Sequence, residues 1–180
     1  MTEPGDQLQT VGALASDLRA LGLAPVLVGG MALVIRGSRR VTRDYDFVIT
    51  HPGDRLDRTL DSLYAHGLEL VSRLDSLGNV VTTIDNRAVA SARLRLDTPA
   101  SAYFYGARTG LRVDLLFDFP IAAVSLRERA TTMTIASHEF TIASDEDLLA
   151  LKRIAAAARS VPGDADDIAF LEARLKRATR

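Results

Sequence analysis

Two adjacent glycines, Gly29 and Gly30, interrupt an apolar stretch and constrain the fold more than any other feature of the sequence. The run PVLV before them is short and apolar, as in a buried strand, and MALVIRG after them predicts a brief helix closed by Gly37. Residues 45–50 alternate and predict a second strand, and a Pro-Gly turn then leads into an amphipathic helix. Strands and helices in this succession predict an α/β or α+β domain with a mixed sheet.

The remainder of the chain predicts more strands followed by a helical end. An amphipathic helix is expected ahead of the first strand, with its apolar stripe over residues 8–21. Further elements are expected as strands at 68–73, 80–85, 92–96 and in LRVDLLFDF, a short helix at 121–129, and a hairpin of TTMTI with HEFTI. Two helices, at 145–159 and 165–176, complete the chain, and Ser144 with Asp147 predicts a capping box for the first. We expect one domain over 1–180, with a mixed-sheet core at 1–143 and C-terminal helices at 144–180 packed on it.

The composition narrows the functional classes. The chain has 180 residues and a net charge of −1, so no overall positive field marks it as a nucleic-acid-binding protein. No apolar run approaches the roughly 20 residues that span a bilayer, and the polar, acidic start is unlike a signal peptide. The absence of cysteine excludes disulfides and thiolate metal sites and suits a reducing compartment. We therefore expect a cytoplasmic protein without membrane attachment, in which any metal is held by oxygen or histidine.

Two aspartates in the second predicted strand point to metal chemistry. Asp44 and Asp46 are two residues apart, so their carboxylates project from the same face of a strand and repel each other. A divalent cation removes that cost, and hard cations such as Mg²⁺ or Mn²⁺ prefer carboxylate oxygens. Asp114 lies in the apolar strand LRVDLLFDF and supplies a third candidate carboxylate. The three aspartates are therefore our candidate metal ligands.

The glycine pair complements these carboxylates. At the end of a strand and the start of a helix, Gly29 and Gly30 would leave backbone N–H groups and the positive helix end open to a triphosphate. Metal and phosphate sites side by side fit two-metal phosphoryl or nucleotidyl transfer. One metal, held by Asp44 and Asp46, would orient the triphosphate. The second, completed by Asp114, would lower the pKa of an acceptor hydroxyl.

The spacing of these motifs resembles a known superfamily. The pattern of two glycines, thirteen residues and Asp-x-Asp, followed by a later strand aspartate, resembles the DNA polymerase β-like nucleotidyltransferase superfamily. The run Arg40-x-Thr42-x-Asp44-x-Asp46 and the ending SDEDLLALKRIAAAARSVPGDADDIAFLE resemble its AbiEii-type, toxin-like branch. The resemblance covers roughly residues 26–171, with a poorly matched middle. Many superfamily members have serine where this chain has Gly30, which would leave only backbone donors for the phosphates.

This resemblance implies a nucleotidyltransferase-type fold and a specific activity. An NMP would pass from an NTP, such as ATP, to an acceptor hydroxyl, and pyrophosphate would be released. The resemblance also implies that Lys152 faces the nucleotide phosphates. Asp167, with Asp164 beside it, is either catalytic or only a cap of the last helix, because acidic residues are favoured in a first helical turn. Arg40 and Arg43 either contact the triphosphate or an RNA acceptor, or pair with the local carboxylates.

The motifs are compatible with three functional hypotheses. The toxin-like branch implies a tRNA or another cellular target and a cognate antitoxin as partner. Short members of the same superfamily adenylylate aminoglycoside-type antibiotics, so a small-molecule acceptor is the second reading. The third is a non-catalytic binding or regulatory protein with the same fold, and the intact set of Asp44, Asp46 and Asp114 argues against it. An acidic acceptor cleft would favour a cationic drug, whereas a broad basic rim would favour RNA.

Overall fold

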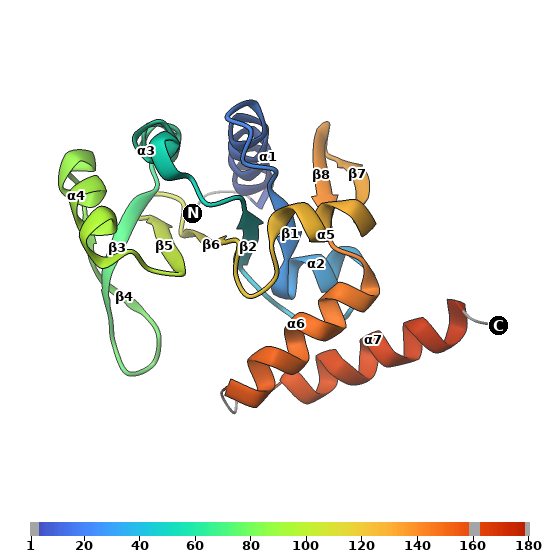
Figure 1. The fold of residues 1–180 in the computed structure, drawn as a ribbon. Helices are drawn as coiled ribbons and strands as arrows, with labels where there is room; N and C mark the ends of the chain where they lie inside the picture. The colour runs from blue at the N-terminus through green and yellow to red at the C-terminus, as the bar shows by residue number, and fades with distance from the viewer. Residues whose placement is uncertain (1–3, 159–162, 179–180) are drawn as a thin grey trace.

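The structure is a computed structural model that describes residues 4–158 and 163–178. One mixed sheet of eight strands, in the order β4-β3-β5-β6-β2-β1-β8-β7, runs through the molecule (Figure 1). The strands are β1 Val26–Val28, β2 Asp44–Ile49, β3 Glu69–Leu74, β4 Val80–Ile84, β5 Ser101–Gly106, β6 Leu111–Phe117, β7 Thr131–Ile135 and β8 His138–Ile142. The helices are α1 Pro4–Ala20, α2 Gly29–Ile35, α3 Leu56–Ala65, α4 Arg87–Asp97, α5 Ala123–Arg129, α6 Asp145–Ala158 and α7 Asp164–Ala178, with a 3-10 turn at Gly53–Arg55.

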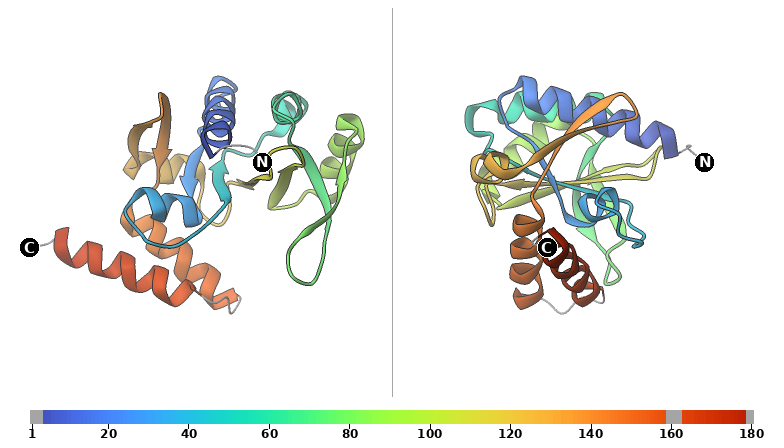
Figure 2. Two further views of the ribbon diagram at one scale, coloured as in Figure 1. Left: turned by 180° about the vertical axis from the view of Figure 1, so that it is seen from behind. Right: turned by 90° about the vertical axis from the view of Figure 1, so that its right-hand side faces the viewer.

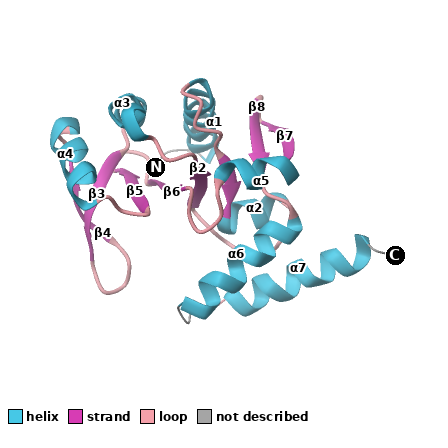
Figure 3. Ribbon diagram, in the orientation of Figure 1, coloured by secondary structure: helices cyan, strands magenta, loops and turns pink. Residues whose placement is uncertain are grey.

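Helices cover the two faces of the sheet unequally. Helices α1 and α3 lie on one side, whereas α2, α6 and α7 lie on the other (Figures 1 and 2). Figure 3 shows that the C-terminal helices pack side by side as a pair, which the sequence predicts. In the described part of the chain, no helix combines the length and apolarity that a membrane span requires.

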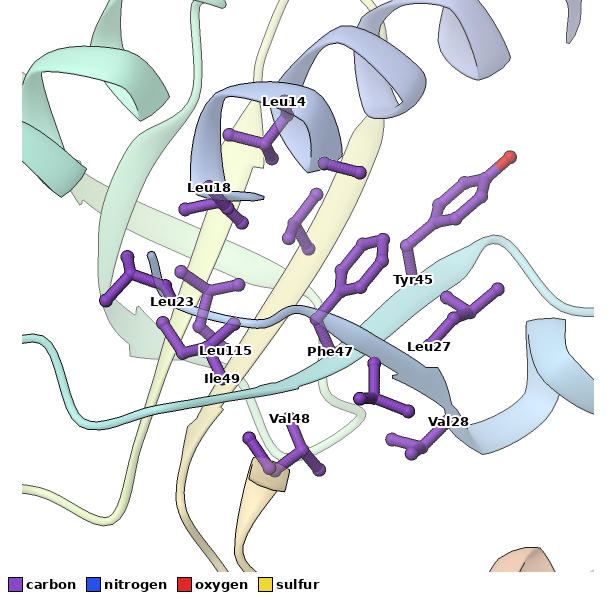
Figure 4. Packing of buried hydrophobic residues seen from close by; sticks show 14 of the residues in the cluster. Leu14, Leu18, Leu23, Leu27, Val28, Tyr45, Phe47, Val48, Ile49 and Leu115 are labelled. Atoms are coloured by element: carbon purple, nitrogen blue, oxygen red, sulfur yellow. The ribbon is translucent and has the colours of Figure 1, made fainter. Parts of the chain in front are cut away.

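The main core lies between the sheet and α1. Leu14 and Leu18 of α1 are fully buried and face Phe47 and Ile49 of β2 (Figure 4). Side chains of a strand alternate between faces, so burying Phe47 and Ile49 against α1 turns Asp44, Asp46 and Val48 to the opposite face. The apolar pattern of β2 therefore fixes where its carboxylates point.

The pairing of β2 with β6 places two aspartates side by side. The strands are parallel, and their register sets Asp46 opposite Asp114 and Asp44 opposite Arg112. On the other edge of β2, the antiparallel strand β1 sets Val28 opposite Asp46. The chain turns into α2 directly after Val28, so the glycine pair lies over the Asp46 side of the sheet.

Most of the predicted elements are confirmed. The strand, glycine pair, helix and strand at the start occur in the predicted order, and TTMTI pairs with HEFTI as an antiparallel hairpin. Ser144 caps α6 as the predicted capping box requires, because its Oγ accepts from the Asp147 N–H at 3.1 Å, and the two side chains meet where the same Oγ donates to Asp147 Oδ2 at 2.9 Å. Residue 159, the predicted last residue of this helix, lies outside the described residues.

The prediction of a strand at 92–96 is wrong, because these residues belong to α4. The segment ARLRL alternates like a strand, but Leu94 is 7 % exposed and Leu96 is 81 % exposed, which a helical turn explains. The Asn86 side chain caps this helix by accepting the N–H groups of Ala88 and Val89. The strand that the sequence analysis missed is β5, Ser101–Gly106, which pairs with both β3 and β6.

Candidate active site

A cleft of about 650 Å³ opens over the face of the sheet that carries the aspartates. It lies between this face and helix α6, which contributes mainly apolar groups together with Lys152. The polar and glycine residues that line it are Gly29, Gly30, Arg40, Thr42, Asp44, Asp46, Gly78, Tyr103, Arg112, Asp114 and Lys152. The apolar ones include Leu148, Leu151, Ile154 and Ala155 of α6, with Phe119 and Pro120. The structure therefore brings the predicted aspartates, both glycines, Arg40 and Lys152 into one cleft.

The carboxyl group of Asp46 has a raised pKa. Its burial, and then the negative charge of Asp44, raise the pKa of Asp46 from 3.8 to about 6. Lys152, a hydrogen bond from the Gly30 N–H and Arg40 oppose this rise in the pKa. A carboxylate held in this way is stabilised in its charged form when a cation binds beside it.

The glycines leave no room for side chains. A Cβ on Gly29 would lie 1.9 Å from Asp46 Oδ2, and Gly29 has a φ of +65°, a conformation that L side chains rarely adopt. A Cβ on Gly30 would lie 3.0 Å from both Arg40 Cζ and Thr42 Oγ1. A side chain at Gly30 would therefore require Arg40 and Thr42 to move by a few tenths of an ångström. Backbone atoms of the strand-to-helix turn approach the aspartates directly.

The donor set at the aspartates fits a hard divalent cation. Asp44 Oδ1 is buried and accepts no hydrogen bond, and its ion-pair partner Arg112 Nη1 is 3.9 Å away. Unsatisfied carboxylate oxygens beside a second and a third aspartate are the ligand type that Mg²⁺ and Mn²⁺ prefer. Among residues 4–158 and 163–178, no three acidic or histidine side chains form a ready-made metal cluster. Ligation by the three aspartates therefore stays a prediction.

Lys152 enters the cleft from α6 and is held from behind by α7. Its side chain is 12 % exposed, and its Nζ lies 2.6 Å from Asp167 Oδ2 and 3.2 Å from Asp164 Oδ1. Asp167 also pairs with Arg40 Nη1. The structure thus places Asp167 under two cations of the cleft wall, and Asp167 is not itself among the residues that line the cleft.

One predicted residue lies outside the cleft, and two residues that were not predicted lie inside it. Arg43 is exposed and lies outside the lining of the cleft. Tyr103 and Arg112 also line the cleft on the sheet, although neither was predicted as a site residue. Arg112 could have been found from its position two residues before Asp114 on the same strand face. Tyr103 could not, because its register opposite Asp114 depends on a strand that the sequence analysis missed.

Solved structures with this fold include nucleotidyltransferases. An antigenic nucleotidyltransferase-like protein from Paracoccidioides brasiliensis matches with a TM-score of 0.59 and 18 % identity, over 93 % of this chain and 76 % of that chain. The lincosamide antibiotic adenylyltransferase LnuA matches with a TM-score of 0.55 and 12 % identity, over 91 % and 95 % of the two chains. The antibiotic-resistance factor ANT(2'')-Ia matches with a TM-score of 0.58 and 11 % identity, over 94 % and 84 %. At sequence identities this low, the structural similarity is evidence for the shared fold alone.

The sequence itself identifies the family. No curated protein matches the chain. Residues 13–178 match the family described as "Nucleotidyl transferase AbiEii toxin, Type IV TA system". This range includes the glycine pair, the three aspartates, Lys152 and Asp167, and it confirms the resemblance drawn from those motifs. The chain therefore belongs to the AbiEii nucleotidyl transferase toxin family and is a nucleotidyltransferase.

Proposed function

We propose that this protein transfers an NMP from an NTP to an acceptor hydroxyl in a reaction that depends on Mg²⁺ or Mn²⁺. The observation that carries the proposal is the register of β2 and β6, which sets Asp46 beside Asp114 directly under the Gly29 turn. Asp44, Asp46 and Asp114 would hold the metal, which when bound supplies positive charge to the phosphates and acidity to the acceptor hydroxyl.

The reaction makes one bond to phosphorus and breaks another. The acceptor oxygen bonds to the α-phosphorus, the bond from that phosphorus to the bridging oxygen breaks, and pyrophosphate leaves with the bonding electron pair. The hydroxyl proton passes to a carboxylate of the cleft. Gly29 and Gly30 both line the cleft, and the backbone of this turn would lie against the phosphates, with the Gly30 N–H also donating to Asp46.

The cations of the cleft wall act on the charge that develops at the phosphates. Lys152 lines the cleft and would lie against the triphosphate as a compact positive charge. Arg40 lines the cleft beside Gly30 and would contact the same ligand. Asp167 would act by holding both cations, and Arg43, which is exposed, would contact the outer part of the NTP or the acceptor.

The acceptor and the cellular role are inferred from the family. A member of a type IV toxin-antitoxin family is expected to act in the cytoplasm on a cellular target, for which we propose tRNA, and to be silenced by a cognate antitoxin. The fold is also that of the antibiotic adenylyltransferase LnuA, so a small antibiotic is the second candidate acceptor. The acceptor panel in the following experiment separates the two.

The proposal is tested by label transfer. The protein is incubated with each α-³²P-labelled NTP, with Mg²⁺ or Mn²⁺, and with total tRNA or a panel of aminoglycosides and lincosamides. We expect label to move to one acceptor class with wild type and with Asp54→Ala, an exposed aspartate outside the cleft. The double variant Asp44→Ala/Asp46→Ala should transfer none. No transfer together with no metal-dependent NTP binding by calorimetry would favour a non-catalytic binding protein.

A further inference from the structure

The face of the sheet that carries the aspartates continues beyond the cleft onto β5. Tyr103 of this strand pairs in register with Asp114, and Tyr105 pairs with Arg112. Residues directly opposite each other on adjacent strands share a face, so both tyrosines lie on the side of the aspartates. Both side chains are partly exposed, and Tyr103 lines the cleft. Two aromatic rings thus stand in a row next to the proposed site of chemistry.

This part of the sheet is covered on the opposite side only. Leu70 of β3 and Phe104 of β5 are buried on the side where α3 and α4 pack. Helices α6 and α7 lie under the other half of the sheet (Figure 1). Within the described residues, no helix covers the tyrosine side of β3 and β5 (Figures 1 and 2). The row of tyrosines is therefore open to a ligand that extends out of the cleft.

The charges beside the tyrosines suit a ligand with phosphates. Arg112 stands next to Tyr105 in register and lies in the cleft lining with Tyr103. Its side chain is 31 % exposed, and its Nη1 lies 3.9 Å from Asp44 Oδ1, so the guanidinium can still bind a phosphate. Glu69 borders Tyr105 on the far side, and Thr83 Oγ1 donates a hydrogen bond to its carboxylate. The positive charge beside the two tyrosines, from Arg112, therefore lies on the side toward the cleft.

We propose that Tyr103 and Tyr105 form a stacking platform for the unpaired end of a nucleic acid strand that serves as the acceptor. The inference rests on the proposed function and names the acceptor class for the same site. Same-face residues of a strand are about 7 Å apart, which allows one base to stack on each ring. Stacking on aromatic side chains is how proteins bind single strands without reading their sequence.

The arrangement also orients the strand. The terminal base stacks on Tyr103, whose cross-strand neighbour is Asp114, so the terminal hydroxyl lies next to the aspartates. The preceding base stacks on Tyr105, and the phosphate between them lies toward Arg112. Two aromatic rings in a row suit successive bases, whereas an aminoglycoside has no aromatic ring that could stack on them. The register of β5 therefore favours the polynucleotide over the small cationic acceptor.

The tyrosine fluorescence of this chain offers a direct test. The sequence has four tyrosines and no tryptophan. Tyr45 is 7 % exposed in the core, and the Tyr64 hydroxyl donates to the Ile84 carbonyl, so neither lies on the proposed platform. With Mg²⁺ present, an RNA octamer with a free terminal hydroxyl should quench the emission of wild type in a saturable way. The double variant Tyr103→Phe/Tyr105→Phe should lose most of the quenching.

Affinity is measured separately by the anisotropy of a labelled octamer. The phenylalanine double variant keeps both rings and should bind within about threefold of wild type. Tyr103→Leu/Tyr105→Leu should bind at least roughly tenfold more weakly. Its melting temperature should stay unchanged. A blunt duplex of the same sequence should bind more weakly than the single strand, because its bases cannot splay onto the rings.

Three results would overturn the platform: equal binding of the octamer by the leucine variant, full quenching in the phenylalanine variant, or tighter binding of kanamycin than of the octamer. These outcomes are distinguishable from failure of the proposed function. Transfer to an antibiotic without octamer binding would sustain the proposed reaction and reject the platform. Octamer binding by the tyrosines without any transfer would support the platform and reject the proposed reaction.

Discussion

At the scale of single residues, the close approach of Gly29 to Asp46 determines the shape of the site. The backbone has a positive φ at Gly29, and any Cβ there would occupy the position of an Asp46 carboxylate oxygen. A glycine at this point therefore meets two separate requirements, one of backbone conformation and one of space. Alanine substitutions can distinguish the effect of the backbone conformation from the effect of the missing space.

We expect Gly29→Ala to abolish metal-dependent NTP binding, because its Cβ displaces the Asp46 carboxylate. Gly53→Ala is the matched control, since Gly53 also has a positive φ of +52° but has no atom within 4 Å of an added Cβ. Both variants should lose about 1–2 kcal/mol of unfolding free energy from the backbone conformation. Calorimetry with Mg²⁺-ATP should show binding only in the control. Normal binding by Gly29→Ala would show that the carboxylate position is not needed.

The raised pKa of Asp46 predicts a pH dependence of stability in the metal-free protein. The pKa rises from 3.8 to about 6 on folding, so between these values the folded state binds more protons than the unfolded state. The contribution of Asp46 is thus fully present below pH 3.8, is lost as pH rises toward 6, and stays constant above that. The loss is at most about 3 kcal/mol.

Asp46→Asn should remove this part of the pH dependence. In EDTA, urea unfolding should show the variant gaining stability relative to wild type as pH rises from 4 to 6, because asparagine does not ionise. Parallel stability profiles for the two proteins would contradict the raised pKa. Since the asparagine variant lacks the charge, added Mg²⁺ should stabilise only the wild type at pH 7.

At the scale of elements, α6 and α7 are joined by a buried, a partly buried and an exposed ionic contact, and the partly buried one joins Arg174 to Asp145. The buried one consists of Lys152 with Asp164 and Asp167, and Asp167 is 4 % exposed. The exposed one joins Arg153 to Glu172, whose side chains are 59 % and 39 % exposed. Buried ion pairs that lose one partner leave an uncompensated charge, whereas exposed pairs contribute little.

Asp167→Asn should therefore destabilise the protein by about 1–3 kcal/mol, since Lys152 and Arg40 lose their shared carboxylate while Lys152 keeps Asp164. Glu172→Gln, which cuts the exposed contact between the same helices, should cost less than about 1 kcal/mol. Urea denaturation of both variants at pH 7 measures the difference. Equal losses would mean that Asp167 does not anchor the two cations. NTP affinity should fall in Asp167→Asn and stay constant in Glu172→Gln.

The elements themselves differ in how far the sequence predicts them. β2 and β6 are predictable because each buries alternate residues and carries polar groups between them. The segment 92–96 misleads because ARLRL fits a period of two over five residues. In the structure, Arg87, Ser91 and Arg95 of α4 all contact Asp57 of α3, which is the four-residue spacing of a helix. Only the partner helix reveals that spacing as the relevant one.

At the scale of the whole molecule, the cleft lies between the sheet and α6, so a ligand bound there contacts both and stabilises their packing. We expect Mg²⁺-ATP at about 100 times its Kd to add about 2.7 kcal/mol to the unfolding free energy. For a chain of this size that corresponds to a rise in Tm of roughly 5–10 °C. Thermal melts of wild type should show the rise with Mg²⁺ and lose it with EDTA, and Asp44→Ala should show none. An equal rise in EDTA would mean that the nucleotide binds without metal.

The local parts of this protein can be predicted from its amino-acid sequence. The glycine pair, the Asp-x-Asp strand, the apolar strand of Asp114 and the C-terminal helices follow from spacing and side-chain chemistry, and those motifs identified the family that residues 13–178 match. Tertiary structure alone decided what these parts face. Strand register sets Asp46 beside Asp114 and Tyr103 beside Asp114, and helix packing turns Asp167 toward Lys152 and Arg40. Such contacts join residues far apart in the chain, and their partners are fixed by burial of the whole core, which no local pattern records.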